Sequence, residues 1–213
     1  MKFLHNINRI EAFSDAVFAF AATLMVVSLG TDNDLSVLQI DLAKFIGFGA
    51  SFFVLVMLWK VHYNFFRRTQ YIDNWIIALN SVLLFVVLYY VFPLKSIIGS
   101  LLNLISGESG TGMTNDGLAQ LFELYGLGFF LIFLCLSLMY YRAYKKCKAI
   151  EAALDLLFYT RHFAIFVGVA LLSIILSKIR IGLHIGLPGI SYFLMAPLCH
   201  FHAVQFDKRR TSK

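Results

Sequence analysis

Polar side chains capable of hydrogen bonding and proton transfer are concentrated in the first 80 residues, inside or beside long apolar runs. Ser14 and Asp15 open the first run, and His62 and Asn80 lie within the second and third. A carboxylate or an imidazole in or at the edge of hydrocarbon is costly unless it has a partner. We therefore expect these groups, together with Trp59, to form one hydrogen-bonded network that joins three helices.

Two questions about this network stay open at the level of sequence. Asp15 pairs either with Arg9, about a turn and a half earlier, or with a polar group on the next helix. His62 is either a structural link or, together with Asp15, part of a membrane enzyme, which would need a cavity open to substrate around both residues. We find no Ser-His-Asp spacing, no paired carboxylates within a run and no nucleotide-binding loop, so we expect no enzyme.

The elements that position these residues are membrane spans. Of the 213 residues 60% are hydrophobic and 14% are charged, whereas soluble proteins carry about 25% charged residues. Because this number of charged residues is too small to cover a surface that faces water, most of the surface must face lipid. We predict an all-α integral membrane protein with a single domain, 1–213, and six spans of about 20 residues each. The spans are expected at 10–29, 42–65, 75–92, 118–141, 162–178 and 187–204, with Pro93 closing the third and the fifth being the shortest.

The basic residues set the expected orientation. They form short clusters between the runs, at 67–68, 142–148 and 208–210. A clustered pattern of this kind argues against nucleic acid as the reason for the net charge of +6. With the N-terminus inside, thirteen of the eighteen Lys and Arg residues fall in inner segments and four in outer ones, and Lys60 lies within the second span. By the positive-inside rule both termini are cytoplasmic.

Bound metal is not expected. The three cysteines, Cys135, Cys147 and Cys199, are an odd number, and their spacing is not that of metal ligands. The sequence therefore predicts neither a zinc site nor a disulfide framework, and no cofactor.

The motifs of the first half resemble a known family. Arg9-x-x-x-Phe13-Ser14-Asp15 at the start of the first span is followed by Trp59-x-x-His62, then by Leu79-Asn80 and Phe92-Pro93. This set is similar to that of the potassium channels of the lysosomal transmembrane protein 175 family, and most similar to its prokaryotic members with a single six-span repeat. The Arg-x-x-x-Phe-Ser-Asp motif is the most specific part of the resemblance.

The resemblance implies a homotetramer in a bacterial cell membrane, in which four copies of the first helix line a pore for potassium ions. The Thr-Val-Gly-Tyr-Gly filter of other potassium channels is missing from the chain. The family's pore-facing positions fall here on Phe20, Thr23, Leu24 and Val27, one stripe of a helix.

In this picture, Thr23 supplies a ring of hydroxyl groups that favours K⁺ modestly over Na⁺. Phe20 and Leu24 form an apolar constriction that stops ions by dewetting, although the family's usual residue at the position of Phe20 is a branched aliphatic. Without the motif, the same stripe would be read as ordinary helix packing.

Just beyond the outer end of the first span, Asp32 and Asp34 are candidates for an acidic mouth that concentrates cations. They fit a solvated loop equally well. Two functional alternatives remain: a secondary transporter, against which the lack of Gly or Pro within the first span argues, and a channel that also passes protons.

Overall fold

The computed structural model describes residues 7–27, 42–106 and 114–211, which fold almost entirely into helices. These are α1 (Ile7–Val27), α2 (Leu42–Thr69), α3 (Asn74–Ser106), α4 (Asn115–Lys146), α5 (Ile150–Lys178), η1 (Leu183–Ile185), α6 (Leu187–Ile190), η2 (Ser191–Leu194) and α7 (Met195–Thr211). No strand occurs within the ranges just given. Six stretches are long and apolar enough to cross a bilayer, and the sixth runs from α6 through η2 into α7. The prediction of an all-α membrane protein with six spans is confirmed.

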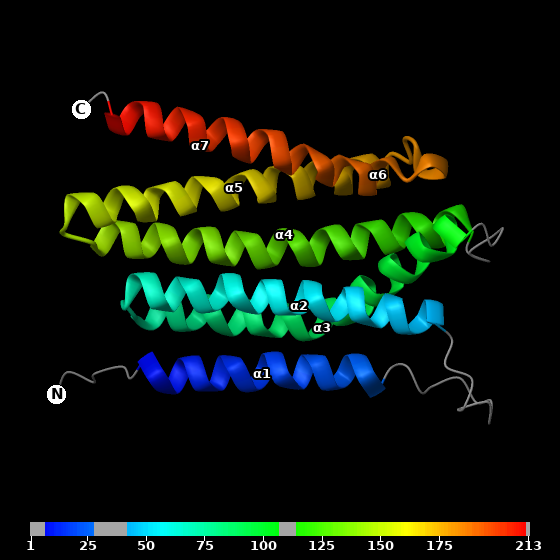
Figure 1. Cartoon of the computed structure of the whole chain (residues 1–213), viewed down its shortest axis with the longest axis horizontal. Helices are drawn as coiled ribbons and strands as arrows, with labels where there is room; N and C mark the ends of the chain where they lie inside the picture. The colour runs from blue at the N-terminus through cyan, green and yellow to red at the C-terminus, as the bar shows by residue number, and fades with distance from the viewer. Residues whose placement is uncertain (1–6, 28–41, 107–113, 212–213) are drawn as a thin grey trace.

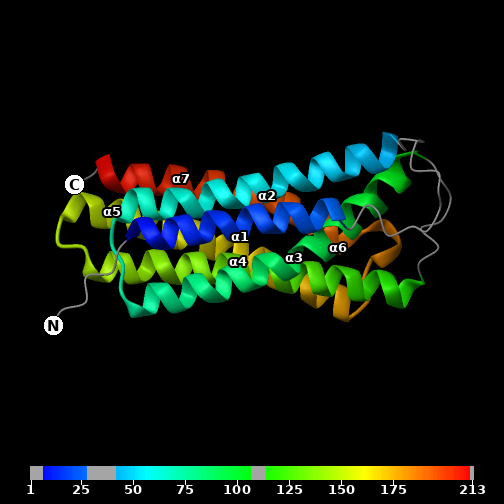
Figure 2. The same cartoon turned by 90° about the horizontal axis from the view of Figure 1, so that it is seen from below.

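The helices run roughly along one common direction and are stacked in layers. In Figure 1, α1 lies at one edge, α2 and α3 form the next layer, and α4, α5 and α7 follow in turn. Figure 2 looks onto α1 and shows α2 on one side of it and α3 on the other. The helix that carries the Arg-x-x-x-Phe-Ser-Asp motif therefore packs against both α2 and α3, and no other described helix covers its outer side.

The connections alternate between the two ends of the bundle. The start of α1, the α2–α3 and α4–α5 connections and the end of α7 lie at the same end (Figure 1). This end carries basic residues in the last turns of two helices, Arg67 and Arg68 on α2 and Lys145 and Lys146 on α4.

Close packing of α3, α4 and α5 forms the centre of the molecule. Gly128 of α4 lies against the ring of Tyr90 on α3, and a Cβ at this position would come within 2.4 Å of that ring. Two buried serines join α5 to α4: Ser137 donates a hydrogen bond to the carbonyl of Thr160 at 2.9 Å, and Ser177 donates one to that of Ala119 at 2.8 Å. Small residues and internal hydrogen bonds allow helices to approach closely in a membrane.

The expectation that Pro93 closes the third span is wrong. Pro93 lies inside α3, which continues to Ser106, and the later part of this helix bends away from the earlier part (Figure 1). Proline removes one backbone hydrogen bond and displaces the preceding turn, and within a membrane neighbouring helices can support the resulting bend.

The fifth helix also differs from the sequence-based boundaries. It begins at Ile150 and has 29 residues, whereas the expected span began at residue 162 and was the shortest. Charged residues in its first turns, such as Asp155 and Arg161, lowered the apparent hydropathy there, although the backbone is helical throughout.

Candidate functional site

One narrow stripe of α1 packs against its own chain. Ser14, Phe18, Ala21 and Met25 are the buried residues of this helix. Their spacing of four, three and four places them on a single face. This face fixes the rotation of α1, so the positions of all its other side chains follow from it.

A chain of hydrogen bonds joins this buried stripe to α2 and α3. The Nδ2 amide of Asn80 on α3 donates to the Ser14 hydroxyl at 3.0 Å, and the Ser14 hydroxyl donates to the carbonyl of Ile10 at 2.8 Å. The Oδ1 of Asn80 lies 2.6 Å from Nε2 of His62 on α2. Because an amide oxygen only accepts, Nε2 must be the donor. Three helices are thus connected through buried polar atoms.

Aromatic rings enclose His62 inside the bundle. This residue is only 2% exposed, and its ring centroid lies 5.4 Å from that of Phe18 and 5.2 Å from that of Phe66. A buried imidazole that is hydrogen-bonded and surrounded by rings has no access to a substrate. This geometry supports the structural interpretation of His62 rather than the enzymatic one.

Asp15 finds its partner on the second helix. The indole Nε1 of Trp59 donates to Oδ1 of Asp15 at 2.7 Å. Of the two partners left open by the sequence, the structure thus provides the polar group on the next helix. Arg9 and Phe13, the other residues of the motif, are exposed on α1 and lie outside this hydrogen-bond chain as far as the chain is described.

The proposed pore stripe lies on the side of α1 that the other described helices leave uncovered. Phe20 is 56% and Val27 63% exposed, Thr23 is exposed, and Leu24 is half-buried. The Thr23 hydroxyl donates its hydrogen to the carbonyl of Ala19 at 3.1 Å. Its oxygen lone pairs are consequently directed away from the helix backbone.

The two acidic residues expected at the outer mouth, Asp32 and Asp34, lie outside the described residues. Within the described ranges, no group of three or more His, Cys, Asp or Glu side chains is arranged to hold a metal ion.

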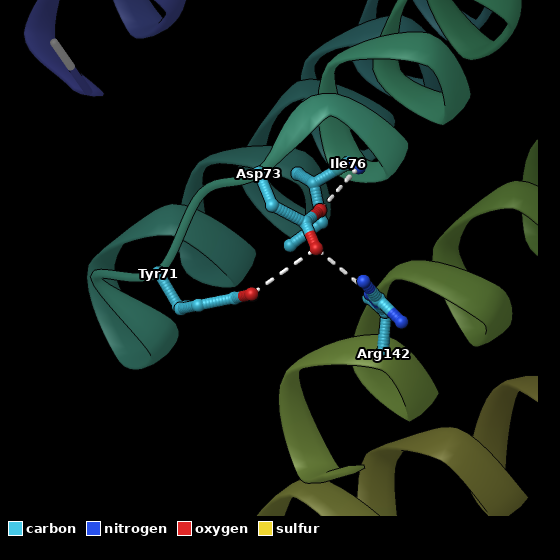
Figure 3. Close-up of polar contacts among 4 residues, drawn as sticks. All are labelled: Tyr71, Asp73, Ile76 and Arg142. Carbon is cyan, nitrogen blue, oxygen red and sulfur yellow. Dashed lines mark hydrogen bonds and ion pairs between the residues drawn. The ribbon is translucent and has the colours of Figure 1, made fainter. Parts of the chain in front are cut away.

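A polar cluster that the sequence reasoning did not identify lies at the α2–α3 turn (Figure 3). Asp73 caps α3, since its Oδ1 accepts the backbone N–H of Ile76 at 2.9 Å. Its Oδ2 accepts from the Tyr71 hydroxyl at 3.1 Å and from Nε of Arg142 on α4 at 2.8 Å. An aspartate three residues before the first buried residue of a helix is a recognisable N-cap signal, but the partner on α4 required the tertiary structure.

The environment of Asp73 shifts its acidity. Burial acts to raise the pKa, but the hydrogen bonds from Ile76, Arg142 and Tyr71, together with the positive charge of Arg142, outweigh it and hold the pKa of Asp73 below its ordinary value. The carboxylate is therefore the form that the fold stabilises at the turn between α2 and α3.

Comparison with known proteins identifies relatives of this chain. Residues 9–90, which run from the first turn of α1 through α2 and about half of α3, match a family model described as the endosomal/lysosomal potassium channel TMEM175. A potassium channel of Marivirga tractuosa is 36% identical over 209 residues, covering 89% of this chain and 83% of the relative. A potassium channel of Chamaesiphon minutus is 31% identical over 93 residues, covering 40% of this chain and 46% of that protein.

Solved structures share the whole architecture. A threonine-to-alanine variant of the potassium channel MtTMEM175, crystallised with a nanobody–MBP fusion protein, superposes with a TM-score of 0.79 at 32% identity, covering 99% of this chain and 95% of that one. A TMEM175 homologue from Chamaesiphon minutus, at 21% identity and a TM-score of 0.60, shares the fold over 94% of this chain and 97% of its own. With the motif, the six helices and a full-length relative in agreement, this chain belongs to the TMEM175 family of potassium channels.

Proposed function

We propose that this protein is a potassium channel in which four copies assemble around an axis perpendicular to the membrane, with α1 of each copy lining the pore. The observation that carries the proposal is the face of α1 opposite the buried stripe. This face is exposed along the whole helix. The hydrogen bonds of Ser14 and Asp15 hold α1 in one rotation on α2 and α3, so the face is presented in a fixed direction.

The spacing of the exposed side chains supports association of parallel copies of α1. Phe13, Ala16, Phe20, Thr23 and Val27 are all exposed and recur at intervals of three and four residues. This is the heptad spacing by which helices pack around a common axis.

The chemistry along this face divides into a hydroxyl ring and apolar rings. Thr23 contributes one hydroxyl per copy, and its oxygen has lone pairs available to a cation because its hydrogen is already donated to Ala19. Four such oxygens replace part of the hydration shell of K⁺, which loses water more readily than Na⁺. Phe20 and Leu24 close the pore by dewetting when it is narrow, and the selectivity for K⁺ over Na⁺ is modest.

The wider setting follows from the same proposal. The basic end of the bundle faces the cytoplasm, so Asp32 and Asp34 are placed at the outer mouth, where four copies would concentrate cations. Single-repeat relatives from bacteria favour the bacterial cell membrane as the location. Flow is passive and driven by the electrochemical gradient.

The selectivity assignment is tested by replacing Thr23 with Ala and, separately, with Ser. Purified protein in liposomes would be assayed for reversal potential under mixed K⁺ and Na⁺, with Ser81→Ala as a control that removes an exposed hydroxyl bonded within α3. We expect Thr23→Ala to reduce K⁺/Na⁺ discrimination, and Thr23→Ser and Ser81→Ala to retain it. Unchanged reversal potentials in an intact Thr23→Ala tetramer would exclude Thr23 from the filter.

A further inference from the structure

An open groove lies between α1 and α2 on one side of the proposed pore stripe. It has a volume of about 320 Å³ and is lined by Asp15, Phe18, Ala19, Ala22, Phe52, Leu55, Val56 and Trp59. Phe18 and Leu55 are buried at its floor, while Ala19 and Phe52 are exposed at its rim. Apart from the hydrogen-bonded pair of Asp15 and Trp59, the groove is apolar.

The groove is large enough to receive an aromatic side chain. An apolar cavity of about 150 Å³ is known to hold benzene in a protein interior, and this groove has about twice that volume. Small side chains at Ala19 and Ala22 provide the space. An unfilled groove of this size would lose the dispersion contacts that stabilise helix association in a membrane.

The opposite flank of α1 carries a large exposed side chain at the same depth. Val17, Phe20 and Leu24 are spaced three and four residues apart, so they share one flank of α1. This flank is turned away from Asp15 and Ala22, which line the groove. Phe20 is 56% exposed. Along the helix it lies within the interval from residue 15 to residue 22 that forms the groove, so one copy displays both a projection and a hollow at one level.

Rotation about an axis perpendicular to the membrane keeps every residue at its depth. In a cyclic assembly, each copy uses one flank toward its left neighbour and the other flank toward its right neighbour. We propose that Phe20 of each copy seats in the α1–α2 groove of the next copy, an inference that rests on the tetrameric channel proposed above. Each Phe20 then fills a hole on the neighbour, as knobs fill holes between packed helices.

The outer faces of α2 and α3 provide a cation and an aromatic ring for a second contact in the same arrangement. Lys60 is exposed on α2 within its membrane span, where a lone cation facing lipid is costly. Phe85 of α3 is 72% exposed, and α2 and α3 lie on opposite sides of α1 (Figure 2). In the proposed assembly, Phe85 of one copy then meets the α2 side of the next copy, which carries Lys60.

Lys60 and Phe85 also lie at similar depths along the bundle. The His62–Asn80 hydrogen bond sets the level of α2 against α3, so Lys60 lies level with Val82. Side chains tilt toward the start of their own helix. Because α2 and α3 are antiparallel, Lys60 and Phe85 tilt toward each other, and an ammonium group over an aromatic face is a favourable contact.

Seating Phe20 in the groove withdraws its ring from the pore axis. The position thus controls conduction in two ways: a seated ring leaves the pore wide, and a displaced ring adds an apolar plug at the constriction. The groove residues Ala19 and Ala22, which do not belong to the pore stripe, determine which position the ring takes.

Cysteine cross-linking tests the contact directly, in a background in which Cys135, Cys147 and Cys199 are replaced by Ser. We expect the pair Phe20→Cys and Val56→Cys to give covalent oligomers up to tetramers on a non-reducing gel after oxidation, because Val56 lines the groove at the level of Phe20. The control pair is Phe20→Cys with Phe85→Cys. These two positions lie at similar depths, but neither lines the groove, so this pair should give no more covalent oligomer than Phe20→Cys alone.

Filling the groove tests its role in conduction. We expect Ala22→Phe to form a tetramer that loses most of its K⁺ flux in liposomes, and the double variant Ala22→Phe/Phe20→Ala to recover it. Ala164→Phe, the same exchange at an exposed site on α5, should keep the flux of the unmodified protein.

The outcomes separate this inference from the proposed channel. An intact, conducting tetramer that neither cross-links at Phe20 and Val56 nor responds to Ala22→Phe would overturn the seating of Phe20, and would leave a lipid chain as the occupant of the groove. A monomeric, non-conducting protein would instead overturn the channel proposal.

Discussion

Asp73 shows how one side chain can connect three parts of the structure. A single carboxylate caps α3, accepts the Tyr71 hydroxyl and pairs with Arg142 of α4. The ion pair is partly exposed, with 20% of the Asp73 side chain and 34% of the Arg142 side chain accessible. The ion pair therefore contributes less to the free energy of unfolding than a buried pair would. The N-cap hydrogen bond to Ile76 adds a separate contribution.

This site predicts a defined response to pH. We expect Asp73→Asn, which retains a capping oxygen but removes the charge, to lower the stability of the detergent-solubilised protein by about 1 kcal/mol or less at pH 7. Folding lowers the pKa of Asp73. The charge therefore stabilises the fold above the unfolded pKa, and this contribution is lost as the pH falls below about 4.

Melting temperatures of wild type and Asp73→Asn between pH 7 and pH 3 give the measurement. The difference between the two should be largest near neutral pH and should shrink on acidification. A difference that stayed constant over this range would mean that the charge of Asp73 does not contribute.

At the residue scale the sequence predicted which polar groups need partners, because a polar group in hydrocarbon has few alternatives. The participants Ser14, His62 and Asn80 could be named in advance, and the structure brings them together. The pairing of Asp73 with Arg142 could not be anticipated, since the two are 69 residues apart and either charge could have remained in the headgroup region.

Among the helices, the approach of α3 to α4 depends on a residue without a side chain. A Cβ on Gly128 would lie 2.4 Å from Tyr90, and this tyrosine is only 1% exposed, so its ring has little room to move. The same interface continues through the contact of Tyr90 with Tyr125, whose ring centroids are 5.4 Å apart.

We expect Gly128→Ala to destabilise the protein by about 1–3 kcal/mol through overpacking. Gly168 of α5 offers a matched control, because a Cβ there meets nothing within 4 Å, and Gly168→Ala should be neutral or stabilising by up to about 1 kcal/mol. Thermal unfolding in detergent would measure both. Equal effects of the two substitutions would show that helix propensity, not the α3–α4 contact, sets the result.

Helix boundaries were less predictable than the existence of the helices. Hydropathy identifies the apolar part of a helix, so it located the middle of α5 but not its start, where Asp155 and Arg161 lie. Pro93 similarly suggested an end where the tertiary structure supports a bend. Both misses arose because neighbouring helices can stabilise a segment whose own sequence disfavours the helix.

For the molecule as a whole, the ends of the bundle differ in charge, and this difference predicts orientation. The α2–α3 connection lies at the end with Arg67 and Arg68, and Arg180 lies past the opposite end of α5. In intact cells a membrane-impermeant thiol reagent should modify Arg180→Cys but not Gln70→Cys, and should modify both after permeabilisation. The reverse pattern would place the termini outside.

Neither the composition nor the periodicity of the sequence could predict how the copies assemble. The sequence indicated a stripe on α1 but could not exclude that it packs inside its own subunit, because periodicity alone does not distinguish a pore from a core. Within residues 7–27, 42–106 and 114–211, that face of α1 is uncovered, which is the tertiary information the sequence lacked.

The hydrogen bonds of Ser14 and Asp15 both lie in the first half of α1, and this placement has a mechanical consequence. Beyond them, α1 is held by the burial of Phe18, Ala21 and Met25, and apolar packing is less directional than a hydrogen bond. Thr23 and Val27 are therefore expected to travel farther than Phe13 when the bore changes width. Small shifts near the start of α1 would therefore be accompanied by larger shifts near its end.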